Sequence, residues 1–190
     1  VCYVSWVVSY VQVLYDTFVF ATSTKIGYAI KNMPLNFVLV LPNIRSAHNV
    51  GAMFRTADGF GVGKIYLVGY TATPPKPQID KVSLGAQLWV PWEKWVYLKA
   101  LVRRLKKGGY SIVALEQTSA SKDMAKASFH GPVALIVGNE VDGVRVDILA
   151  LCDMVIHIPM HGHKESLNVS VAAGIAMYEI RKRLDGKKDV

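Results

Sequence analysis

The chain has 190 residues, of which 52% are hydrophobic and 19% are charged. This length suits one domain with a substantial core, and the composition excludes a disordered protein. Lysine and arginine outnumber aspartate and glutamate by 22 to 14, which gives a formal net charge of +8. That excess favours a polyanionic partner such as nucleic acid.

The two cysteines, Cys2 and Cys152, lie at opposite ends of the chain. This spacing predicts neither a disulfide framework nor a paired-cysteine metal site, so a reducing cytoplasm is the expected location.

The first 35 residues differ from the rest. Residues 1–15 carry no charge, and Asp16 interrupts the apolar run. A membrane helix needs about 20 mostly apolar residues, so we do not expect a membrane anchor. A signal peptide is not expected either, because a basic start and a small-residue cleavage site are missing. The chain does not begin with Met, which indicates a fragment or an uncertain start. We interpret residues 1–35 as an N-terminal extension of uncertain role and residues 36–190 as one domain.

Strands and helices alternate along that domain. Short apolar runs predict buried strands at residues 37–41, 65–68, 110–115, 133–137 and 154–158. Helical spacing of apolar residues predicts helices at 49–60, 92–107 and 169–184. The proline-rich residues 71–78 are expected to be a loop. Such alternation is typical of an α/β fold in which a parallel sheet is covered by helices on both faces.

Ligands of parallel α/β sheets bind beyond the carboxyl ends of the strands. The loops that begin there start at Pro42, Gly69, Glu116, Gly138 and Pro159.

The segment after the first strand carries two polar side chains that could take part in binding or catalysis. Asn49 is expected to cap the following helix, and Arg55 lies under two turns further on. A guanidinium offers a fork of donors that matches phosphate or carboxylate. An ordinary solvated surface arginine is the alternative interpretation.

The loop after the fourth strand is Gly-Asn-Glu-Val-Asp-Gly, residues 138–143. Gly138 would let a ligand approach the backbone, and Glu140 could receive an amine or fix a loop. The same residue types are also ordinary turn formers.

The most specific segment follows the last strand. The chain leaves the sheet at Pro159, passes a polar loop that contains Gly162, and enters a helix of small residues at Ser166-Leu167-Asn168. Ser166 or Asn168 can cap that helix. Backbone groups that face a cleft at such a junction suit a small polar ligand.

Together these three motifs, in this order and at these separations, resemble the SpoU branch of the SPOUT RNA methyltransferases (TrmH-like). The resemblance runs from about Phe37 to Arg183. It implies an α/β fold with a C-terminal trefoil knot, a homodimer, S-adenosylmethionine as cofactor, and methyl transfer to a ribose 2′-hydroxyl of tRNA or rRNA. Knots are rare in proteins, so this feature follows from the resemblance alone.

The resemblance also implies roles for residues of the three motifs. Asn49 and Arg55 match the first motif, Glu140 matches the second, and Ser166 and Asn168 match the polar pair of the third. Because a guanidinium rarely loses its proton, we expect Arg55 to stabilise the developing alkoxide and a nearby phosphate.

The cofactor positions that carry over are Gly138, Ile158 and Leu167, with Met160 nearby. Among the basic residues, Arg45 and His48 of the first loop are the preferred RNA contacts. Many relatives carry a separate N-terminal RNA-binding domain, and about 35 residues are too few for one.

Other interpretations are weaker. Residues 59–64 lack the flanking residues of a phosphate-binding loop. His157, His161 and His163 have no cysteine pair beside them, so no metal is expected. The tryptophans at 89, 92 and 95 are expected on the buried face of a helix. A catalytically silent RNA-binding protein on the same fold is the main alternative function, and an α/β enzyme that uses another nucleotide is a third.

Overall fold

The structure is a computed structural model that describes residues 36–186. Its strands are β1 (Phe37–Pro42), β2 (Lys64–Val68), β3 (Trp92–Trp95), β4 (Ser111–Leu115), β5 (Lys122–Asp123), β6 (Val133–Val137) and β7 (Met154–His157). Its helices are α2 (Ala47–Gly59), α3 (Pro77–Ser83), α4 (Leu98–Lys107), α5 (Val146–Leu149) and α6 (Val169–Asp185), with short 3-10 turns η1 (Ala86–Leu88) and η2 (Met124–Lys126). The interpretation of residues 1–35 as an extension concerns residues outside this described part.

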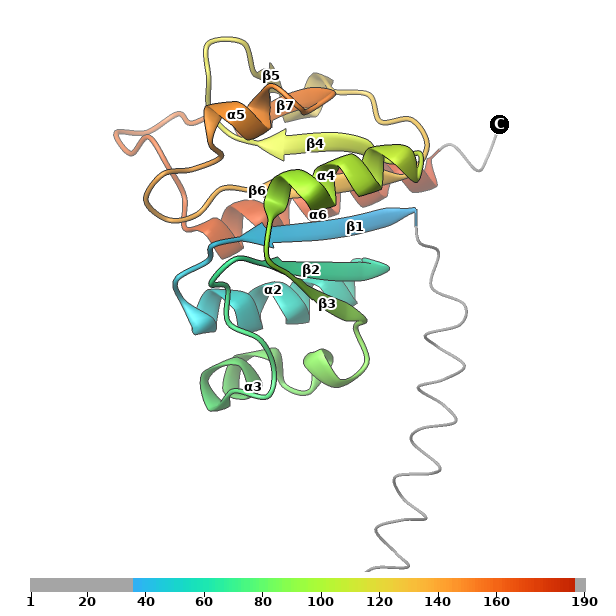
Figure 1. The fold of residues 1–190 in the computed structure, drawn as a ribbon. Coiled ribbons are helices and arrows are strands. Elements are labelled where there is room, and N and C mark those ends of the chain that lie inside the picture. Colours follow the sequence, from blue (N-terminus) through green and yellow to red (C-terminus); the bar gives the residue numbers. More distant parts are fainter. Residues whose placement is uncertain (1–35, 187–190) are drawn as a thin grey trace, which may run out of the picture. The chain divides into compact units, whose positions relative to one another are not determined.

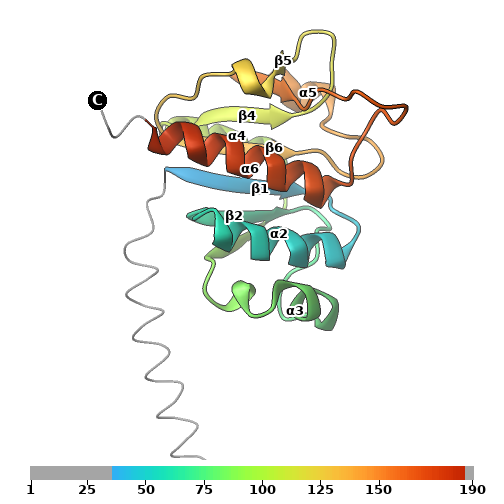
Figure 2. The same ribbon diagram turned by 180° about the vertical axis from the view of Figure 1, so that it is seen from behind.

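The strands form one seven-stranded sheet in the order β3-β2-β1-β6-β4-β7-β5. Every neighbouring pair is parallel, which confirms the predicted sheet. Helices α4 and α5 cover one face (Figure 1), and α2 and α6 cover the other (Figure 2). The trefoil knot stays a prediction.

Alternation along the central strands divides the core between the two faces. In β1, Phe37, Leu39 and Leu41 pack in one cluster with residues of α2 and α6. Val38 and Val40 pack in the other cluster with residues of α4 and α5. All five side chains are fully buried. Because both faces are covered, the strand is a continuous apolar run.

The helix predicted at residues 92–107 is wrong in its first part. Residues 92–95 form strand β3, paired with β2 from Ile65↔Trp92 to Val68↔Trp95, and the helix begins only at Leu98. The tryptophan periodicity resembled a helical face, but backbone pairing with β2 decided the conformation. An ion pair between Lys64 and Glu93, 2.6 Å long, joins the two strands.

Two boundaries also differ from expectation. Helix α2 begins two residues earlier than predicted, because the Ser46 hydroxyl accepts a hydrogen bond from the backbone N–H of Asn49 at 3.3 Å. Ser46 is therefore the N-cap, and Asn49 lies inside the first turn. The predicted loop at 71–78 ends sooner than expected, because α3 starts at Pro77, a position at which proline suits a helix.

Candidate active site

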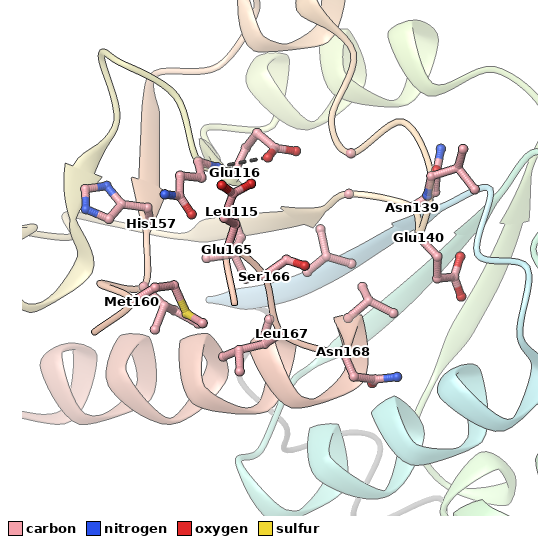
Figure 3. Close-up of a pocket in the computed structure, with 18 residues that line it drawn as sticks. Leu115, Glu116, Asn139, Glu140, His157, Met160, Glu165, Ser166, Leu167 and Asn168 are labelled. Atoms are coloured by element: carbon pink, nitrogen blue, oxygen red, sulfur yellow. Dashed lines mark hydrogen bonds between the residues drawn. The ribbon is translucent and has the colours of Figure 1, made fainter. Parts of the chain in front are cut away.

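A pocket of about 590 Å³ opens at the carboxyl edge of the sheet (Figure 3). Its walls come from the end of β4, the loop after β6, the segment after β7 and the start of α6. They comprise residues 115–117, 137–141, 143, 157, 158, 160, 165–169 and 172. The volume lies in the range of small-molecule sites. Two of the three predicted motif loops thus line one pocket.

The first loop joins this pocket through Glu140. One carboxylate oxygen of Glu140 accepts a hydrogen bond from the backbone N–H of Arg45 at 3.0 Å. The other accepts from the backbone N–H of Ser46 at 3.2 Å and from Nδ2 of Asn49 at 2.9 Å. A single side chain therefore satisfies free N–H groups at the start of α2 and orients the Asn49 amide.

These contacts also set the ionisation of Glu140. Partial burial by itself raises the pKa of the carboxyl, but hydrogen bonds from backbone N–H groups, including that of Arg45, and from the Asn49 amide outweigh burial and lower the pKa. Hydrogen bonding to the charged form favours that form. Glu140 is therefore held as a carboxylate, in a position to fix the loop.

Asn168 connects the third motif to the first. Its Oδ1 accepts from the backbone N–H of Ser170 at 2.9 Å and so caps α6, as predicted. Its Nδ2 donates to Oδ1 of Asn49 at 3.3 Å. Hydrogen bonds thus link Glu140 to Asn49 and Asn49 to Asn168, and this connected series includes one residue from each of the three motifs.

Gly138 is required for a reason that the sequence did not reveal. A Cβ at Gly138 would lie 2.7 Å from Cα of Gly143 and 2.9 Å from the backbone nitrogen of Val144. The loop closes on itself there, with Asn139 and Gly143 exchanging backbone hydrogen bonds of 3.2 and 3.3 Å. The glycine gives the loop room to fold back next to the pocket.

The other predicted residues fall into two groups. The cofactor candidates Gly138, Ile158, Met160 and Leu167 all line the pocket, as does the exposed Ser166. A second group lies outside the lining: Arg45, His48 and Arg55, which are all exposed.

Arg55 is separated from the pocket by the geometry of α2. Six residues after Asn49, it projects about 120° around the helix and about 9 Å along it. Within residues 36–186 no hydrogen bond or ion pair is found for the Arg55 side chain. The structure thus brings Asn49, Glu140 and Asn168 together but leaves the Arg55 guanidinium outside the pocket lining.

Several pocket residues were not predicted: Glu116, Gln117, Asn139, His157 and Glu165. Two of them carried a signal, since Glu116 begins a loop at the carboxyl edge and His157 ends a strand there. The others come from loop conformations that only the folded chain defines.

The described residues hold neither a candidate metal-binding cluster nor a candidate membrane-spanning helix. No cluster of three or more His, Cys, Asp or Glu side chains is placed to bind a metal ion among residues 36–186. No helix in the same range is long and apolar enough to cross a membrane.

Comparison with known proteins agrees with this geometry. The model of the SpoU rRNA Methylase family matches residues 36–178. The tRNA (guanosine(18)-2'-O)-methyltransferase of Aquifex aeolicus is 35% identical over 153 residues, 80% of this chain and 72% of the relative. The 23S rRNA (guanosine-2'-O-)-methyltransferase RlmB of Vibrio parahaemolyticus is 38% identical over 151 residues, 79% of this chain and 61% of the relative. The chain thus spans about three-fifths of the latter.

Solved structures give the same result. The A. aeolicus TrmH/SpoU tRNA modifying enzyme superposes with a TM-score of 0.79 at 29% identity, covering 90% of this chain and 86% of that one. An AdoMet-bound rRNA methyltransferase from Sinorhizobium meliloti superposes with a TM-score of 0.73 at 29% identity, over 78% of this chain and 56% of the other. Sequence motifs, sheet, pocket and relatives agree, and the chain belongs to the SpoU family of RNA methyltransferases.

Proposed function

We propose that this chain transfers a methyl group from S-adenosylmethionine to a ribose 2′-hydroxyl of tRNA or rRNA. The observation that carries the proposal is the hydrogen-bonded chain from Glu140 through Asn49 to Asn168. It joins three motifs, far apart in sequence, at the rim of one pocket. A packing role alone would not require three polar side chains to be linked at an exposed rim.

The pocket suits the cofactor in size and chemistry. Apolar side chains, including Leu115, Ile158 and Leu167, can pack against an adenine ring, and backbone groups beside Gly138 can bind its polar edge. Met160 extends the same wall. The bound cofactor would supply an already activated methyl group, so the protein has to position the acceptor and manage its proton.

The residues around Asn49 would perform the positioning. Asn49 and Ser166 offer hydrogen-bonding groups near the pocket mouth, and Asn168 and Glu140 hold the Asn49 amide. Alignment of two reactants can lower a barrier by roughly 7–11 kcal/mol in favourable cases. Arg55 keeps its proton and would stabilise the developing alkoxide and a neighbouring phosphate.

Arg55 is not among the residues that line the pocket, so we propose that the protein acts as a homodimer in which a second subunit presents Arg55 to the site. A shallow apolar groove between α2 and α6 supports this proposal. Val171, Ile175 and Tyr178 are 51%, 38% and 53% exposed there, and Ala52 and Thr56 of α2 line the same groove. Exposed apolar surface of this kind is typical of subunit interfaces. Arg55 lies three residues after Ala52 in α2, on the same side of the helix, and would lie at the interface.

Mixed dimers test this arrangement. Arg55→Ala removes the guanidinium that a subunit would present to its partner's site. Asn168→Asp removes the Nδ2 donor and keeps an oxygen that can cap α6. If Arg55 acts in the partner's site, random mixing of the two inactive variants restores about a quarter of wild-type activity, because half the dimers contain one intact site of two. Mixtures that stay inactive, with mixed dimers verified by two affinity tags, would show that Arg55 does not act across the interface.

The activity itself is tested with radiolabelled S-adenosylmethionine and bulk tRNA or rRNA. Label in RNA that resists alkaline cleavage at one site identifies a 2′-O-methyl product. Tight RNA binding without cofactor binding or label would instead support the catalytically silent alternative.

We further propose that residues 36–190 form the methyltransferase domain and that Arg45 and His48 contact RNA. We also propose that the protein works in the cytoplasm, where tRNA and rRNA are found.

A further inference from the structure

The cofactor pocket has the opposite charge to the protein as a whole. Among the described residues that line it are the carboxylates of Glu116, Glu140 and Glu165, and none of those lining residues is lysine or arginine. The complete chain carries a formal charge of +8. A negative pocket in a basic protein favours a small cation inside and repels the phosphates of RNA from its interior.

Glu116 is the carboxylate that is fixed in the pocket wall. One oxygen accepts a hydrogen bond from the backbone N–H of Val144 at 2.6 Å. The other accepts a hydrogen bond from the backbone N–H of Gln117 at 2.9 Å (Figure 3). The side chain also lies against Gly143, where any Cβ would collide with it. A carboxylate has about four acceptor positions, so two remain after these bonds. Glu116 is thus a positioned negative charge with spare acceptor capacity.

The other two carboxylates differ from Glu116 in what they contact. Glu140 accepts three hydrogen bonds from the start of α2, which directs its charge to the loop. Glu165 is exposed and makes no hydrogen bond or ion pair within residues 36–186. Its charge adds to the field in the pocket, but water screens an exposed charge more than one held in the wall, so its contribution is smaller than that of Glu116.

A methyl transfer changes the charge that this pocket holds. The sulfur–methyl bond breaks and its electron pair stays on sulfur. The new bond forms between the methyl carbon and the ribose oxygen, whose proton passes to water or to a phosphate oxygen of the RNA. A cationic sulfonium thereby becomes a neutral thioether. We propose that Glu116, assisted by Glu165, is a specificity-determining residue that favours the cationic donor over the neutral product. This inference rests on the proposed function of the pocket.

This charge preference would favour replacement of the demethylated product by a new molecule of the methyl donor. Coulomb attraction acts over several ångströms and requires no direct contact with the sulfur, although it weakens with water in between. Once the methyl group has left, the sulfur is neutral and the attraction from Glu116 is lost, so the pocket holds the product less tightly than the cationic donor. The expected contribution of Glu116 is about two- to fivefold in the ratio of the two affinities, and that of the exposed Glu165 is smaller.

Calorimetry with three ligands tests the proposal without any turnover. The ligands are S-adenosylmethionine, its demethylated product S-adenosylhomocysteine, and sinefungin, which carries an amine cation near the sulfur position. Glu116→Gln should weaken both cationic ligands relative to the product by about two- to fivefold, and Glu165→Gln should change the ratio in the same direction by a smaller factor. Asp185→Asn removes the same charge at the far end of α6, where Asp185 is outside the pocket lining, and should leave the ratio unchanged.

Glu116→Gln also places an amide beside two N–H donors, so its melting temperature has to be compared with that of the wild type. Glu165→Gln keeps the test valid if that variant unfolds, because the Glu165 side chain makes no hydrogen bond or ion pair among residues 36–186. Ratios that stay constant in the folded variants would overturn the inference alone. A wild-type chain that binds none of the three ligands would overturn the proposed function, and the inference with it.

Discussion

Replacement of Glu140 by glutamine removes one charge and little volume. In the native protein the two carboxylate oxygens accept three hydrogen bonds, from the backbone of Arg45 and Ser46 and from the Asn49 amide. Glutamine has one acceptor oxygen, and its NH₂ group would face an N–H donor. At least one donor at the start of α2 then loses its partner.

The expected loss in the free energy of unfolding can be estimated from these contacts. Hydrogen bonds to a charged group contribute about 1.5–3 kcal/mol each when buried, and exposure of Glu140 to water reduces this figure. We expect Glu140→Gln to lower the free energy of unfolding by about 2 kcal/mol, which corresponds to a melting temperature lower by roughly 4–8 °C for a domain of this size. Misplacement of Asn49 should in addition lower methyl transfer by on the order of 10²-fold.

The pH dependence gives an independent check. Because the pKa of Glu140 is lowered in the folded chain, the stabilisation is complete above the ordinary carboxyl value of 4.5 and is lost as the pH falls through the lower, folded value. The difference in melting temperature between wild type and Glu140→Gln should therefore be full at neutral pH and shrink in acid. Glu165→Gln, which has no contact to lose in the described part, is the matched control. A Glu140→Gln protein that melts with the wild type at neutral pH would refute this reasoning.

Three further changes follow from the described contacts. Gly138→Ala puts a Cβ 2.7 Å from the Gly143 backbone, so we expect a loss of about 1–3 kcal/mol in urea unfolding and weaker cofactor binding; normal stability and affinity would contradict this. Thr71→Val removes the buried hydroxyl that accepts the Ile44 N–H at 2.9 Å, and the expected loss of about 1–3 kcal/mol is measured in the same way. Arg45→Ala should reduce the slope of log affinity for RNA against log salt by about one, and an unchanged slope would exclude a phosphate contact.

Local sequence determined much of the sheet. The apolar run of β1 predicted a strand buried on both faces, and the polar residue at 168 predicted the cap of α6; both are confirmed. These features depend on residue types within a few positions of one another, so a single sequence contains them. The order of the motifs was equally informative, because the order and spacing of three short segments already indicated the family.

Only the tertiary structure decided three other matters. Trp92–Trp95 became a strand because β2 offered an unpaired edge, and Gly138 proved necessary because Gly143 folds back against it. The Glu140 carboxylate meets Asn49 from 91 positions away in the chain. Local propensity has no information about such partners, since each depends on a backbone brought close by the rest of the fold. The resemblance grouped Arg55 with the other motif residues, whereas in the fold its side chain lies outside the pocket lining.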